Sequence, residues 1–168
     1  MPTYFSTNNN IVLLQKINEA STTKKHELGT IITATDRDST SYGVGEFIYL
    51  KGVASTVAGS VVLYQADDYS TKLATSGDIG PIALAMAANV ADTFGWYQIK
   101  GKGISKVASG FADNSSCYLS ATAGVLSNTV SAGNYVFNIK GGSDIGSVGT
   151  GLAEVELERP FITGLSSF

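Results

Sequence analysis

The chain has 168 residues, 43% of them hydrophobic, which is enough for one domain with a buried core but not for two full domains. Only 15% of the residues are charged, the net charge is −3 and no basic block occurs, so no direct nucleic-acid partner is expected. One cysteine and one histidine, Cys117 and His26, exclude an intrachain disulfide and a Cys/His metal centre.

The longest apolar stretch, residues 79–91, is interrupted by Pro81 and Asn89. It is shorter than the roughly 20 residues that a membrane-spanning helix needs. Residues 1–14 also lack the basic region and the long apolar run of a secretory signal. We therefore expect a soluble chain with no membrane partner and no export signal.

The first 28 residues differ from the rest, with a polar Asn8–Asn10 tract, an apolar patch and then a stretch rich in Lys and Thr. They predict an extended N-terminal arm, residues 1–28, that lies across a neighbouring subunit, ahead of a body of residues 29–168. A first strand preceded by a frayed tail explains the same pattern equally well. The candidate contact residues of this arm are Tyr4, Phe5, Ile11, Val12, Leu13 and Leu14.

From Gly29 onward, short β-rich runs alternate with clusters of Gly, Asn, Asp and Ser, a pattern typical of antiparallel sheets. The runs are too closely spaced for crossover helices, and only Ala85–Thr93 is a candidate for one short helix. We expect an all-β fold, an antiparallel β-barrel or sandwich of about 8–10 short strands. The expected strands are Thr30–Thr35, Glu46–Lys51, Ser60–Gln65, Pro81–Ala87, Trp96–Lys100, Ile104–Ala108, Cys117–Ser120, Tyr135–Lys140 and Leu152–Glu158.

Three segments, 45–52, 95–101 and 133–141, share one plan: a glycine, an aromatic-rich strand and a Lys-Gly exit. In several of these strands both faces look apolar, and a single sheet does not bury both faces by itself. Either other elements of the chain cover the second face, or a partner chain does. The candidate residues for a subunit interface are Phe47, Tyr49, Trp96 and Tyr97.

The last expected strand alternates strictly between apolar side chains and glutamates, which predicts one buried and one acidic face. The acidic face either protects an edge strand from aggregation or contacts a basic partner surface. Its glutamates are Glu154, Glu156 and Glu158.

The run Asp36-Arg37-Asp38-Ser39-Thr40 has the Asp-x-Asp-x-Thr pattern of the nucleophile loop in haloacid-dehalogenase-type phosphatases. In such a loop Asp36 would attack phosphorus and Asp38 would act as acid/base, with a magnesium ion shielding charge. That chemistry needs a central parallel strand with helices behind it, and the chain lacks helical periodicity. A polar turn is the favoured interpretation. Calcium could also bind at Asp36, Asp38, Asp67 and Asp68, but these residues do not follow the ligand spacing of a known loop. We expect no enzyme activity, cofactor or metal.

Four runs, 45–55, 80–87, 95–101 and 151–161, resemble small virion proteins of tailed phages, and the order of the chain resembles the phage head decoration proteins of the lambda type. The resemblance implies a β-rich body, a homotrimer on the capsid exterior, and the major capsid protein as partner. A tail, baseplate or host-binding fibre module, built from the same kind of strands, is the alternative function.

Overall fold

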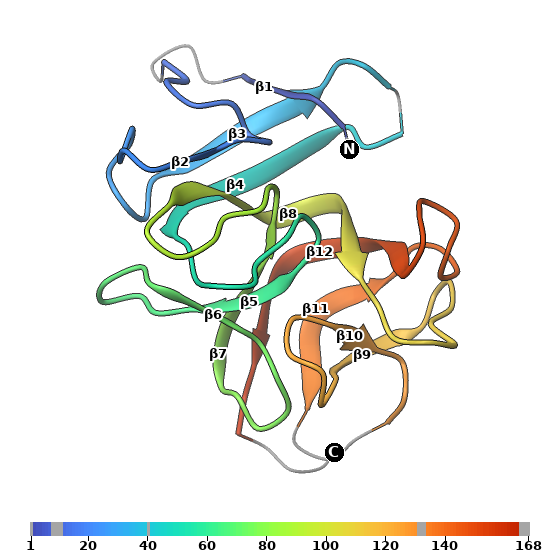
Figure 1. Cartoon of the computed structure of the whole chain (residues 1–168). Coiled ribbons are helices and arrows are strands. Elements are labelled where there is room, and N and C mark those ends of the chain that lie inside the picture. The colour runs from blue at the N-terminus through green and yellow to red at the C-terminus, as the bar shows by residue number, and fades with distance from the viewer. Residues whose placement is uncertain (1, 8–11, 40, 131–133, 165–168) are drawn as a thin grey trace.

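The computed structural model describes residues 2–7, 12–39, 41–130 and 134–164 (Figure 1). Within them the strands pair antiparallel in one sheet of twelve strands that is sandwich-like and not closed into a barrel, which confirms the expected all-β fold. The strands are β1 (Tyr4–Ser6), β2 (Ala20–Ser21), β3 (Ile31–Asp36), β4 (Val44–Lys51), β5 (Val61–Tyr64), β6 (Thr71–Leu73), β7 (Gly80–Ala85), β8 (Phe94–Lys106), β9 (Ser116–Leu119), β10 (Leu126–Ser127), β11 (Tyr135–Gly141) and β12 (Leu152–Ile162).

The sheet runs in the order β1-β3-β4-β8-β7-β12-β11-β9-β10, with β2 beside β8 and with β5 between β6 and β7. Its central strand, β8, pairs with β4 along its first half and with β12 along its second half. The expectation of two separate strands, 96–100 and 104–108, was therefore wrong. Gly101 lies inside β8 with a φ of +99°, so the glycine allows a local distortion of one continuous strand and does not end it.

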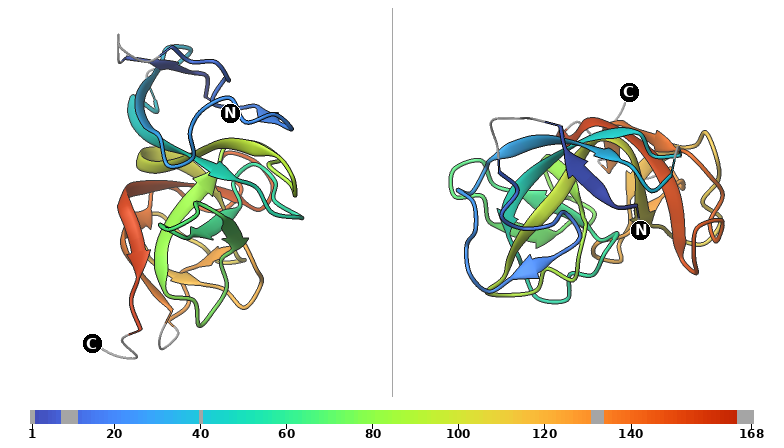
Figure 2. Two further views of the ribbon diagram at one scale, coloured as in Figure 1. Left: turned by 90° about the vertical axis from the view of Figure 1, so that its left-hand side faces the viewer. Right: turned by 90° about the horizontal axis from the view of Figure 1, so that it is seen from above.

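Both faces of β4 and β8 are buried inside the chain. Phe47 and Tyr49 point to one face, where the N-terminal segment covers them, and Ile48 and Leu50 point to the other, where β5 and β7 cover them. Figure 2 shows the N-terminal segment stacked on one side of these central strands. The apolar character of both faces is thus explained by this chain's own elements.

The described residues of the N-terminal segment, 2–7 and 12–28, do not form an extended arm, and of the two expectations the first strand is the correct one. β1 pairs with β3, and β2 pairs with β8. Tyr4 is 4% exposed and Ile17 1% exposed, in the same cluster as Phe47 and Trp96. The physical reason is that packing here removes the apolar faces of both the segment and β4 from water.

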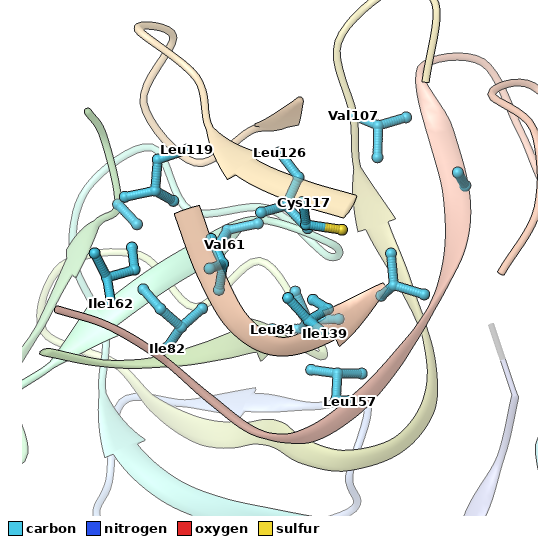
Figure 3. Close-up of a cluster of buried hydrophobic side chains, with 14 of the residues drawn as sticks. Val61, Ile82, Leu84, Val107, Cys117, Leu119, Leu126, Ile139, Leu157 and Ile162 are labelled. Carbon is cyan, nitrogen blue, oxygen red and sulfur yellow. The ribbon is translucent and has the colours of Figure 1, made fainter. Parts of the chain in front are cut away.

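A second core lies at the other end of the molecule, between β5 and β7 on one side and β9–β12 on the other, and Val107, just after β8, joins it (Figure 3). Alternate residues of β12, Ala153, Val155 and Leu157, point into it, as the sequence pattern predicts. Cys117 lies in this core with no exposed surface, as expected for a small apolar side chain.

No helix forms over residues 85–93, although the sequence made this the one helical candidate. Asn89 is buried here, donating a hydrogen bond from Nδ2 to the Tyr97 hydroxyl at 2.6 Å and accepting one from Thr93 Oγ1 at 2.6 Å. Such side-chain bonds stabilise a turn at the expense of a helix. No helix of the described chain is long and apolar enough to span a membrane.

Candidate functional site

The glutamates of β12 are paired with lysines of the neighbouring strands. Glu154 lies 2.8 Å from Lys102 Nζ and Glu158 lies 2.8 Å from Lys100 Nζ, both on β8. The third pair, Glu156 with Lys140 Nζ on β11, is 3.2 Å apart. β12 is also an interior strand between β8 and β11, so the interpretation as an edge strand was wrong. The acidic face predicted as a contact surface carries charges that the chain itself compensates.

The Asp36 carboxylate stabilises a turn at the end of β3. It accepts hydrogen bonds from the Asp38 backbone N–H at 3.1 Å and from Ser39 Oγ at 2.5 Å, and the residue is 4% exposed. β3 lies between two antiparallel strands, β1 and β4. This environment differs from the parallel strand and helices that the phosphatase loop requires. Thr40 of the motif lies outside the described residues.

Asp68 likewise caps a turn, because both the backbone N–H and the Oγ of Ser70 donate to its Oδ1. These hydrogen bonds lower the pKa of Asp68. Across the described ranges, no three His, Cys, Asp or Glu side chains come close enough together to hold a metal ion.

The aromatic residues proposed for a subunit interface are core residues, which corrects that expectation. Phe47, Tyr49 and Tyr97 have no exposed surface, and Trp96 is 1% exposed. Burial raises the pKa of Tyr97 above its ordinary value. These side chains are therefore unavailable to a partner, and only the alternative that other elements of the chain cover them is correct.

A different aromatic row, which the sequence reasoning missed, lies across β9, β11 and β12. Tyr118 and Tyr135 have ring centroids 5.5 Å apart, Tyr135 and Phe137 4.8 Å, and Phe137 and Phe161 5.1 Å. Phe161 is 37% exposed and the other three are partly exposed. The alternation of Tyr135 and Phe137 along one strand was the available signal, but exposure depends on which face the fold covers.

The six candidate contact residues of the N-terminal segment differ in how far they are buried. Tyr4 is buried, Leu13 packs partly buried against the core around Phe47, and Ile11 lies outside the described residues. The three that remain exposed are Phe5 at 42%, Val12 at 76% and Leu14 at 63%.

Val12 and Leu14 are presented next to a buried anchor, Gln15, which sequence reasoning did not single out. Gln15 is 4% exposed, and its Nε2 donates to the backbone oxygens of Glu19 at 2.7 Å and Phe94 at 2.8 Å.

Two core side chains complete the anchor. Tyr49 Oη donates to Gln15 Oε1 at 2.6 Å, and Trp96 Nε1 donates to the Gln15 backbone oxygen at 3.1 Å. The bonds from Tyr49 and Trp96 are buried and the two made by Gln15 Nε2 are partly buried, and hydrogen bonds in such surroundings are costly to lose. The segment that carries the two exposed aliphatic side chains is thereby fixed to the central strands.

Comparison of the chain with known protein families, with curated proteins and with solved structures gives no match.

Proposed function

We propose that this chain is a structural virion protein that binds the exterior of an assembled tailed-phage capsid and bridges neighbouring major capsid protein subunits. The observation that carries the proposal is the pair Val12 and Leu14, two exposed aliphatic side chains on a segment fixed by Gln15. The choice of the major capsid protein as partner follows from the proposed resemblance of the sequence to head decoration proteins.

The energetics suit a protein that binds in many copies. Burial of a Val or Leu side chain contributes roughly 1.5–3 kcal/mol, so two of them give a modest contact for a single copy. A bridging protein adds its binding free energy to the shell only while the shell is intact, and the effect accumulates over the lattice. Self-association as a homotrimer would add to this effect, because once one subunit has bound, the contacts of the other two form at a high effective concentration.

Because the segment is already folded onto the body, little ordering entropy is lost when it binds. An extended arm would lose much more, since each residue fixed on binding costs about 1–2 kcal/mol. This difference favours a contact through the ordered residues Val12 and Leu14.

The test is co-sedimentation of purified protein with capsids that lack it, using the double variant Val12→Asp/Leu14→Asp. The matched control is Val130→Asp/Ile79→Asp, because these side chains are equally exposed, at 77% and 63%. We expect the N-terminal variant to lose occupancy and the control to keep it. Sedimentation mass and thermal melting of each protein show separately whether self-association or folding has changed.

Two outcomes contradict the proposal: unchanged occupancy of the N-terminal variant, or equal loss in both variants. Saturation of native particles at a dozen copies or fewer would instead assign the protein to a tail, baseplate or fibre, because a decoration protein covers the whole lattice.

A further inference from the structure

His26 is the chain's one histidine, and it holds the segment that carries Val12 and Leu14. Its Nε2 accepts a hydrogen bond from the Leu14 backbone N–H at 3.2 Å. Its ring lies against two core aromatic rings, Trp96 at 5.0 Å and Tyr49 at 5.3 Å between centroids. The same two residues hold Gln15, so His26 and Gln15 fix adjacent residues of the segment to one aromatic pair.

The hydrogen bond to Leu14 requires a neutral imidazole. Nε2 accepts only when it carries no proton, which places the ring proton on Nδ1. An imidazolium has two N–H donors and no acceptor, so protonation turns the contact into two donors facing each other. The Leu14 N–H then loses its partner, while the four hydrogen bonds of Gln15 do not depend on this proton.

We propose that protonation of His26 releases the Leu14 backbone from the body and thereby weakens the contact made by Val12 and Leu14. The release itself follows from the geometry of His26, whereas its effect on the capsid rests on the function proposed above. The result is a surface that holds its partner at neutral pH and loosens it in acid.

The groups around His26 do not favour its charged form. Lys24 and Lys25 precede it in the same loop, and Lys24 is paired with Glu27 at 3.1 Å. β4 contributes the Tyr49 hydroxyl, which donates a hydrogen bond to Gln15 and accepts one from the Lys25 backbone N–H. β8 contributes the Trp96 ring. On the segment itself, Lys16 is paired with Glu19 at 3.6 Å.

The two aromatic rings attract a cation, but their planes are inclined to the imidazole by 59° and 69°, so neither stacks flat on it. Burial lowers the pKa of His26. The stability that the neutral ring contributes is therefore complete above the unfolded-state pKa of about 6.5 and declines as the pH falls below it.

Amide hydrogen exchange of the full chain, followed by NMR between about pH 8 and pH 5, tests the release. After correction for intrinsic rates, we expect the Leu14 amide to lose about tenfold protection in acid. The Gly29 amide, which donates to the Tyr49 backbone oxygen at 2.8 Å, is the internal reference and stays protected. In His26→Gln the side-chain oxygen accepts from Leu14 without titrating, so the acid effect disappears.

Unchanged protection of Leu14 in acid, or the same loss in His26→Gln, overturns the proposal. Capsid co-sedimentation at the same pH values separates the two ideas. If exchange responds as expected but acid leaves occupancy unchanged, the release stands and residues 12–14 are not the capsid contact. If acid lowers occupancy only in the chain with His26, both proposals are supported.

Discussion

The Tyr4 ring packs edge-on against Phe47 of β4, with ring centroids 4.6 Å apart and planes inclined by 61°. The Tyr4 hydroxyl also donates to the Lys102 backbone oxygen at 3.3 Å on β8. These contacts join the fourth residue of the chain to its two central strands. The N-terminal segment is therefore part of the core and supports the surface that it carries.

The substitution Tyr4→Ala should destabilise the protein by about 3 kcal/mol, because it removes a buried aromatic ring from a packed cluster. Phe5→Ala is the matched control, since Phe5 is the next residue of β1 and is 42% exposed. Denaturant unfolding measures both. Deleting residues 3–14 should likewise destabilise the body, whereas the loss of a free arm would leave it unchanged. A Tyr4→Ala variant as stable as Phe5→Ala would contradict this packing.

Gly101 should not accept a side chain. Its φ is +99°, and a Cβ at this position would lie 2.6 Å from the Val44 backbone oxygen. We expect Gly101→Ala to cost about 3 kcal/mol, from backbone strain plus a backbone clash. Gly110 has a φ of +83° with nothing within 4 Å of its Cβ position, so Gly110→Ala should cost only about 1 kcal/mol. Similar losses of stability in both variants would show that the nearby β4 backbone adds nothing to the cost of a side chain at position 101.

Cys117 should be chemically inert in the folded protein. Burial raises the pKa of its thiol from 9.0 to about 12, so little thiolate exists at neutral or mildly alkaline pH. The stability gained from a neutral thiol is present below the unfolded pKa and is lost as the pH rises towards the folded value. A disulfide reagent at about pH 8 should label the denatured chain once and the native chain only as fast as it unfolds. Rapid native labelling would contradict the burial.

The ion pairs of β12 should differ in their effect on stability. Glu154 and Lys102 side chains are only 16% and 32% exposed, so Glu154→Gln should cost about 1 kcal/mol. Glu156 and Lys140 are 54% and 50% exposed, and solvent screens their interaction. Glu156→Gln should therefore change the free energy of unfolding little. Chemical denaturation at low and high salt measures both variants, and an equal cost would show that exposure does not set their strength.

The expected strands that proved correct are those with an unambiguous local pattern. The alternation of β12 and the glycine-bounded run of β4 lie where the sequence placed them, apart from their ends. The short strands β2, β6 and β10 were missed, since two or three residues carry no periodicity and their pairing depends on distant partners. Gly101 was expected to end a strand, because a glycine that ends a strand and one that distorts it look alike in sequence.

Of the candidate surface, the sequence identified Val12 and Leu14 as apolar but not Gln15 or His26 as the residues that hold them. Gln15 forms hydrogen bonds with Phe94 and Trp96 of β8, about eighty positions further along the chain. No local sequence pattern predicts such a contact. The exposure of an apolar residue is also invisible in sequence: Tyr4 and Phe5 are adjacent, yet one is 4% and the other 42% exposed.

The sequence by itself determined that this protein is all-β, because residue alternation and glycine-rich turns are local properties that follow from backbone sterics. Only the tertiary structure decided which aromatic residues are core, which glutamates are neutralised and where residues 2–7 and 12–28 lie. Those outcomes depend on which strand meets which, and that is set by burial and pairing summed over the whole chain.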